Sequence, residues 1–198
     1  MSFAVRISIP SNTAGPALAR VREAMEPSAV AKVAGLGAHE VVRNHLLAAN
    51  RDRPNRLGGR RTEFYRRAAN LTSFTSDATG AIVSIGGPRG IAQRFFGGTV
   101  VPKNSKYLTV PAIAAAHGKR ARDFRGLVFM RNKGKETARL VDPQTGAVYY
   151  WLVKRVTQQP DRTVLPADEE IVGNIRNRLD RRVARAIRDA GPAQEGTA

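Results

Sequence analysis

Residues 80–112 read GAIVSIGGPRGIAQRFFGGTVVPKNSKYLTVPA, and the rest of the chain is organised around this stretch. Apolar residues alternate at 81–85, and this spacing of two predicts a strand. Two glycine pairs bracket residues 91–96, whose apolar side chains predict one or two helical turns. Extended runs at 99–103 and 107–110 complete the pattern. No side chain in the stretch has a catalytic context, so we expect it to serve assembly.

The composition is that of a globular but strongly basic chain. Its 198 residues carry a formal net charge of +17, which predicts a polyanionic neighbour: nucleic acid, an acidic protein surface or a membrane. The absence of cysteine excludes disulfides, thiolate metal sites and cysteine nucleophiles. No apolar run approaches the roughly 20 residues that span a bilayer, and residues 1–10 lack the apolar core of a signal peptide. We therefore expect a protein made in the cytoplasm, with no membrane partner.

The amino-terminal third of the chain predicts one strand and two helices. Residues 3–9 alternate like a half-buried strand, and residues 13–25 carry apolar side chains at helical spacing. Residues 28–50 form a longer amphipathic pattern with Gly35 and Gly37 in its middle. These glycines predict either a bend or break in the helix or close packing against a sheet.

The remainder of the chain predicts short strands and one more long helix. A basic loop at 51–61 precedes a short helix at 62–71, in which we expect Phe64, Ala68 and Leu71 to face inward. Residues 74–85 predict a hairpin that turns at 77–80, residues 127–141 predict a second hairpin, and residues 148–156 form the most β-prone run. The apolar stripe over 167–190, with three acids in its first turn, predicts a carboxyl-terminal amphipathic helix. We expect an α+β fold: a twisted, mostly antiparallel sheet packed against a long N-terminal helix and a C-terminal amphipathic helix.

The expected organisation is a single domain over residues 1–190. Extended basic loops lie near 51–62 and 117–139, and residues 191–198 form a flexible tail. Within this domain we expect residues 80–112 to supply the core of the sheet and one wall of a subunit interface.

No catalytic centre, cofactor site or metal site is predicted. The glycine-rich turn at 86–90 lacks the spacing of a dinucleotide fingerprint and the Lys-Ser/Thr ending of a phosphate-binding loop. The one run of acids, 168–170, lies where the start of a helix favours negative charge. The three histidines are scattered, and no serine has a nucleophile-elbow context. We therefore expect the chain not to be an enzyme.

Basic segments are the strongest remaining signal. Residues 51–67 hold seven arginines and two acids, and residues 119–139 hold eight basic and two acidic residues. Such segments can neutralise phosphates, so one hypothesis is a nonspecific nucleic-acid-binding protein with salt-dependent affinity. The other is a positive face that is solvated or that meets acidic surfaces on neighbouring subunits. No sequence-specific DNA- or RNA-binding motif accompanies the charge.

The order of motifs resembles a known family. A long amino-terminal helix precedes a basic, glycine-containing loop, and an arginine-rich helix comes late in the chain. Between them, the glycine pair at 97–98 is followed by Pro102, Lys103, Lys106, Leu108 and Pro111. In these features, over roughly residues 29–190, the chain resembles the phage virion morphogenesis proteins. These are tail-completion, neck and tail-terminator proteins of tailed bacteriophages, including Mu-like phages. Arg94 stands where that family commonly has a histidine.

The resemblance implies a structural virion protein at the neck or tail top. Such a subunit forms a homo-oligomeric ring, a hexamer, which completes or terminates the tail and joins it to the head. Its partners are head-completion or connector proteins and the tail tube protein, with nonspecific contact to DNA in the lumen. The residues that we expect at subunit or inter-ring contacts are Arg51, Arg53, Arg56, Arg60, Arg61, Phe95, Phe96, Lys103, Lys106, Lys119, Arg120 and Arg122. A charged replacement of Phe95 or Phe96 is expected to abolish folding or ring formation.

Overall fold

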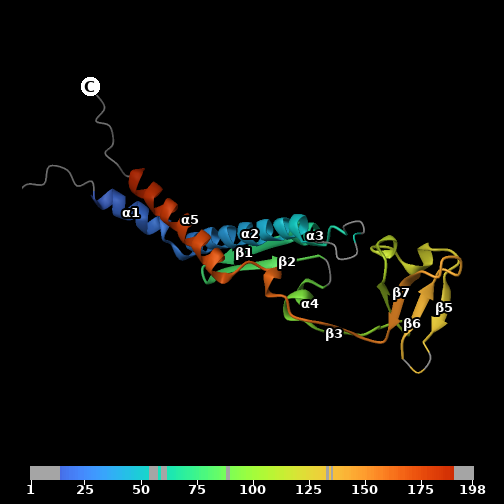
Figure 1. Cartoon of the computed structure of the whole chain (residues 1–198). Coiled ribbons are helices and arrows are strands. Elements are labelled where there is room, and N and C mark those ends of the chain that lie inside the picture. The colour runs from blue at the N-terminus through green and yellow to red at the C-terminus, as the bar shows by residue number, and fades with distance from the viewer. Residues whose placement is uncertain are drawn as a thin grey trace, which may run out of the picture. The chain divides into compact units, whose positions relative to one another are not determined.

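The structure, a computed structural model, describes residues 14–53, 58, 62–87, 90–132, 134 and 136–189 (Figure 1). The chain divides into two compact units. The first combines residues up to 42 with 72–84 and with those from 167 onward, and the second combines 43–71 with 85–166. The predicted strand at 3–9 and the predicted tail at 191–198 lie outside the described residues.

Helices dominate the first unit. It contains α1 (Ala14–Ala24), the amino-terminal part of α2 (Pro27–Asp52) and α5 (Asp168–Arg188), with the paired strands β1 (Thr72–Asp77) and β2 (Gly80–Ile85). The Asp77 carboxylate closes the turn between the strands, because it accepts hydrogen bonds from the backbone N–H groups of Thr79 and Gly80. Hydrogen bonds from the hydroxyl and backbone of Thr79 hold the pKa of Asp77 below its usual range.

Two glycines allow α2 to approach other elements of the first unit closely. A Cβ atom at Gly35 would lie 2.5 Å from Cδ2 of Phe74 on β1. A Cβ atom at Gly37 would lie 3.1 Å from Cδ of Arg178 on α5. Because α2 continues through both positions, close packing accounts for these glycines and no break occurs.

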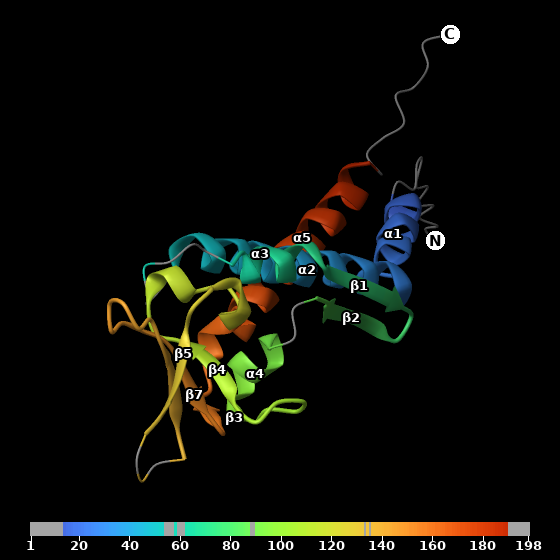
Figure 2. The same ribbon diagram turned by 90° about the vertical axis from the view of Figure 1, so that its right-hand side faces the viewer.

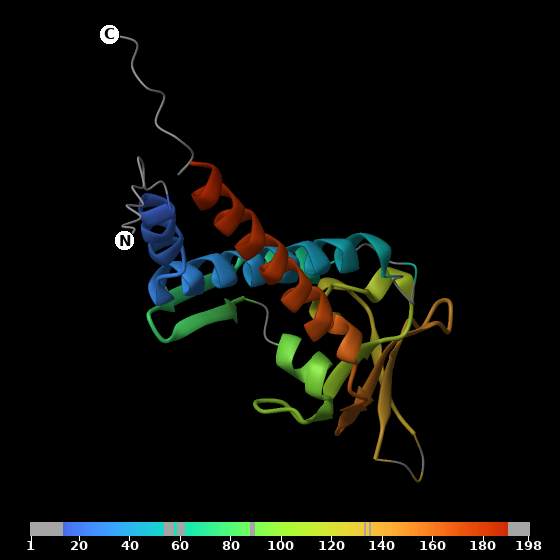
Figure 3. The same cartoon turned by 90° about the vertical axis from the view of Figure 1, so that its left-hand side faces the viewer.

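Helices α1 and α5 lie side by side in the first unit (Figures 1 and 3). At their contact, Arg182 Nε donates a hydrogen bond of 2.9 Å to the carbonyl of Ala24, the last residue of α1. This bond satisfies one of the carbonyl groups that a helix end leaves without an intrahelical partner. No residue of α5 is fully buried, so its apolar stripe is only partly covered.

Strands dominate the second unit, which distributes them between two sheets. The strands β4 (Leu108–Pro111), β7 (Val148–Val153), β6 (Ala138–Val141) and β5 (Val128–Arg131) form an antiparallel sheet in that spatial order. Figure 2 labels β4, β5 and β7 of this sheet. The strands β3 (Gly98–Val100) and β8 (Val156–Gln158) form a separate antiparallel ribbon. The unit also contains α3 (Phe64–Asn70), α4 (Ile91–Phe96) and the short 3₁₀ helices η1 (Ala114–Ala116), η2 (Ala121–Asp123) and η3 (Arg162–Val164).

Tyr150 is the centre of the core beneath the four-stranded sheet. Its side chain is almost fully buried, as are those of Leu152 on the same strand and Ala138 on β6. The Tyr150 hydroxyl donates to the carbonyls of Ala116 and Lys119, each at 3.2 Å, and so holds η1 against the sheet. Burial raises the pKa of Tyr150 above its ordinary value.

The predicted α+β class, with its long N-terminal helix and C-terminal helix, is confirmed. The prediction that residues 80–112 form the core of one sheet is wrong, because β2, β3 and β4 belong to three different sheets and α4 has no fully buried residue. The inward position of Leu71 is also wrong: α3 ends at Asn70, Leu71 is 54% exposed, and Tyr65 is buried instead. The single domain over residues 1–190 stays a prediction.

Candidate interaction surfaces

A network of arginine and aromatic side chains surrounds Tyr65 in the second unit. Tyr65 is a buried residue of α3, and its hydroxyl accepts hydrogen bonds from Arg53 Nη1 at 3.1 Å and from Arg94 Nη1 at 3.2 Å. Arg53 follows the end of α2, and Arg94 belongs to α4. Two guanidinium groups from distant parts of the sequence therefore meet on one phenolic oxygen.

Asp161 supplies the negative charge in this network. Its Oδ2 atom lies 2.6 Å from Arg53 Nη1, and its Oδ1 atom accepts hydrogen bonds from the hydroxyl and backbone N–H of Thr163. Its backbone N–H donates to the carbonyl of Arg94 at 2.9 Å. The bonds from Thr163 and then from Arg53 hold the pKa of Asp161 below its usual range. The network thus ties the end of α2 to α3, α4 and η3.

Two arginines of this region stack on aromatic rings. The guanidinium carbon of Arg94 lies 4.5 Å from the centroid of the Phe64 ring, and that of Arg162 lies 4.6 Å from the centroid of Phe95. Phe95 packs edge-on against Phe96, which is 65% exposed. Neither Arg94 nor Arg162 forms an ion pair with an acid among the described residues. The exposed Phe96 therefore lies beside Arg162, whose guanidinium carbon is 5.7 Å from the centroid of the Phe96 ring and which forms no ion pair with an acid of the described residues.

Strand β5 forms an exposed edge of the four-stranded sheet. It pairs with β6 on one side and, within the described residues, with no strand on the other. All four of its side chains are exposed, and three consecutive ones are large and apolar: Val128, Phe129 and Met130. Such an edge carries unpaired backbone groups and is a template for pairing with another strand.

The residues predicted at subunit contacts do not form one cluster: Phe95 and Phe96 lie in α4, and the basic residues come from several other segments. Lys103 and Lys106 are exposed in the segment between β3 and β4, and Lys119, Arg120 and Arg122 are exposed in and before η2. Arg51 is exposed and pairs with Asp52, whereas Arg53 turns into the Tyr65 network. Arg56, Arg60 and Arg61 lie outside the described residues. The structure thus brings Arg53 together with Tyr65, while the exposed lysines stay in separate segments.

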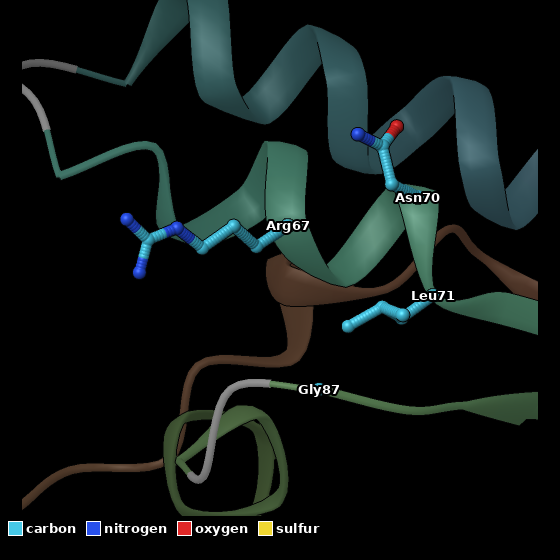
Figure 4. A pocket seen from close by; sticks show the side chains of 4 residues that line it. All are labelled: Arg67, Asn70, Leu71 and Gly87. Carbon is cyan, nitrogen blue, oxygen red and sulfur yellow. The ribbon is translucent and has the colours of Figure 1, made fainter.

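The hollows of the second unit contain no evident reaction centre among the residues that the structure describes. An open hollow of about 370 Å³ is lined by Arg67, Asn70, Leu71 and Gly87, with Leu71 directed into the space between α3 and Gly87 (Figure 4). A second hollow of about 340 Å³ includes Asp123, Asp142 and Tyr149. The Asp142 carboxylate is already bonded to Gln144 and Thr145 of its own turn. In the described part of the chain, no three histidine or acidic side chains are grouped as metal ligands would be.

Sequence reasoning did not find the partners that organise the network. The expectation placed Phe64 inward, although Tyr65 beside it is the residue that is buried. Asp161 lies in a polar stretch with no motif, so nothing in the sequence marks it as a partner of Arg53. The helical spacing within α3 does indicate Tyr65, since Tyr65, Ala68 and Ala69 share one face of that helix and are its buried residues.

Among the described residues, no helix is both long enough and apolar enough to cross a membrane.

Comparison with known proteins finds no match among family models, curated proteins or solved structures. Function is therefore inferred from the surfaces described above and from the resemblance of the sequence motifs, which stays a prediction.

Proposed function

We propose that the chain is a structural virion protein of a tailed bacteriophage, a subunit of a ring at the head–tail junction that completes or terminates the tail and joins it to the head. The observation that carries the proposal is the exposed edge of β5. Val128, Phe129 and Met130 are 47%, 51% and 42% exposed, and they follow one another on a strand that pairs on one side only within the described residues.

Natural proteins usually protect such an edge. Charged side chains, proline, bulges or covering loops prevent pairing with other chains. The opposite edge strand, β4, ends with Pro111, which removes a hydrogen-bond donor. β5 has only Arg131 at its end and no proline. An edge that is apolar and unprotected in a monomer is what a subunit requires if a neighbour covers that edge in the assembly.

A ring of identical subunits needs two different contact surfaces on each copy. A heterologous contact of this kind closes into a ring when the rotation between subunits permits it. The exposed lysines and arginines at 103, 106, 119, 120 and 122 are available to meet acidic surfaces of head-completion, connector or tail tube proteins, or DNA in the lumen. The hexamer and these partners come from the family resemblance.

The test measures the mass of the assembly that the purified protein forms in solution and images that assembly by electron microscopy. Purified wild-type protein is expected to form a ring visible by electron microscopy, and the protein is expected in purified virions. Val128→Lys places a charge on the exposed edge and is expected to leave a folded monomer. Ile82→Lys is the matched control, because Ile82 is also an exposed apolar strand residue. A wild-type protein that stays monomeric and is absent from virions would overturn the proposal.

A second candidate function is nonspecific nucleic-acid binding. The specific observation in its favour is the net charge of +17, with Lys103, Arg120 and Arg122 exposed and unpaired by acids among the described residues. A titration on duplex DNA at increasing salt tests it, since neutralising phosphates makes affinity fall steeply with salt. The absence of binding at moderate salt removes this candidate.

A further inference from the structure

The outer face of the four-stranded sheet carries an arginine with an unsatisfied donor. Arg139 lies on β6, its Nε atom is buried, and within the described residues this atom has no hydrogen-bond partner. Arg139 also forms no ion pair there. Buried donors without a partner are rare in native structures, and each requires an explanation.

Strand register places Arg139 in the middle of an apolar row. Val110 on β4 is opposite Trp151 on β7, Trp151 is opposite Arg139, and Arg139 is opposite Met130 on β5. Directly opposed residues of antiparallel strands share a face. The neighbouring row, which contains Tyr150, is on the covered face of the sheet. The Arg139 row therefore lies on the opposite face, and Trp151 and Met130 in it are 41% and 42% exposed.

The composition of this row is that of an interface centre. Tryptophan, methionine and arginine are enriched in protein interfaces, and tryptophan and arginine dominate binding energy there. Nucleic acid is a poorer fit, since nonspecific strand binding uses several aromatic residues along a basic groove. The row has one aromatic residue, one cation and two aliphatic or thioether side chains. The chemistry that fits is a protein surface with a carboxylate beside an apolar side chain.

The chain itself contains such a surface. Asp168, Glu169 and Glu170 begin α5, all three are exposed, and Val172 beside them is 58% exposed. This is the only run of three acids in a chain whose net charge is +17. Two such chains repel one another unless their contact places acids against a basic site. The three carboxylates also outweigh the partial positive charge, about half an elementary charge, of the helix end that carries them.

We infer that the first turn of α5 of a second copy docks on the Val110–Trp151–Arg139–Met130 row. A carboxylate of that turn forms an ion pair with the partly exposed Arg139, whose Nε atom stays covered by its own chain, and Val172 packs against Trp151 and Met130. Four strands about 4.8 Å apart give a row of roughly 14 Å, which accommodates a helix end about 10 Å wide. The two surfaces differ, so the contact is heterologous and supplies the head-to-tail joint of the proposed ring. The contact between two copies is inferred independently of the proposed function; only the closure of successive contacts into a ring rests on it.

A charge exchange in the full chain tests the contact. Arg139→Glu and the pair Glu169→Lys with Glu170→Lys are each expected to weaken self-association by at least about tenfold, measured by sedimentation velocity. The three changes combined are expected to restore most of it. Glu23→Lys with Glu26→Lys is the matched control, because it alters net charge equally at exposed acids of the first unit. It is expected to leave association unchanged.

Trp151 reports on the contact directly because it is the only tryptophan of the chain. Its emission is expected to shift to shorter wavelength on association in the wild type and to stay constant with concentration in Arg139→Glu. Arg139→Met keeps an apolar stem and removes the unsatisfied donor, so it is expected to weaken association without lowering the melting temperature. A lower melting temperature would indicate a structural role for Arg139 within one copy and overturn the inference.

Three further outcomes also overturn it: no recovery in the combined variant, equal weakening in the control, or an effect of Arg139→Glu without an effect of the α5 reversal. The last would identify a different chain or nucleic acid as the occupant. If the charge variants leave a ring intact, the inference fails and the proposed function stands. If the wild type is absent from virions but the charge exchange restores self-association, the proposed function fails and the inference stands.

Discussion

Arg53 and Asp161 form an ion pair across 108 residues of sequence, with Arg53 Nη1 2.6 Å from Asp161 Oδ2. The same guanidinium group donates to Tyr65 and Thr163. This single side chain therefore links the end of α2 to α3 and to η3 in the second unit.

Removing the Arg53 guanidinium should destabilise the protein. Arg53→Met leaves the Asp161 carboxylate without its cation and removes one donor to the buried Tyr65 hydroxyl, so a loss of about 1–3 kcal/mol in the free energy of unfolding is expected. Urea unfolding at neutral pH measures it. Arg51→Met is the control, because the Arg51 side chain is 78% exposed and pairs at the surface with Asp52. Its effect should stay within about 0.5 kcal/mol, and equal losses in both variants would contradict the network.

Asp161 should also make stability depend on acidity. Its pKa in the folded protein is below the ordinary value because Thr163 and Arg53 bond its carboxylate. The folded state therefore binds fewer protons than the unfolded state as pH falls, so the contribution of Asp161 is fully present above the unfolded pKa of about 3.9. It is lost as pH falls through the lowered, folded pKa. Asp161→Asn should show a shallower loss of stability than the wild type below about pH 4, as measured by urea unfolding at a series of pH values.

The helical glycines give a pair of opposite predictions. Gly35→Ala puts a methyl group 2.5 Å from a ring carbon of Phe74, so overpacking should cost about 1–3 kcal/mol despite the better helix propensity of alanine. Gly173 lies within α5, and a Cβ atom there would meet no described atom within 4 Å, so Gly173→Ala should stabilise by up to about 1 kcal/mol. Thermal unfolding followed by circular dichroism compares them, and a stabilising Gly35→Ala would refute the close packing.

Replacing Phe95 or Phe96 with glutamate should have different effects on folding and on ring formation. Phe96 is 65% exposed, so Phe96→Glu should retain the fold and reduce ring formation. Phe95 is half-buried, with its ring against Phe96 and against Arg162, so Phe95→Glu should also lower the melting temperature. Circular dichroism and mass measurement separate the two effects. A Phe96→Glu variant that assembles like the wild type would remove Phe96 from the proposed interface.

Local sequence patterns predicted many of the helices and strands, but they did not predict which strands pair or which distant side chains meet. The apolar stripe of α5, the hairpin turn at Asp77 and the helix at 91–96 each depend on neighbours within a few residues, and the structure has all three. The division of β2, β3 and β4 among different sheets depends on partners such as β8, more than 50 residues from β3. In the same way, no local feature indicates that Arg53 and Arg94 meet on Tyr65. Periodicity shows that a strand or helix forms, but it does not identify its partner.

Gly97 should be the most sensitive glycine of the central stretch. Its φ of +74° is in the left-handed region, and a Cβ atom there would lie 2.7 Å from the backbone nitrogen of Pro160 and 2.8 Å from the carbonyl oxygen of Gln158. Backbone atoms cannot move aside as a flexible side chain does, so Gly97→Ala should disturb both the end of α4 and the pairing of β3 with β8.

Gly146→Ala is the matched control for this prediction. Gly146 has a similar φ of +71°, but a Cβ atom there would meet no described atom within 4 Å, so only the conformational cost of about 1 kcal/mol applies. Urea unfolding should show a clearly larger loss of stability for Gly97→Ala than for Gly146→Ala. Equal losses would mean that backbone conformation alone explains Gly97 and that the close approach of β8 to the end of α4 does not constrain this position.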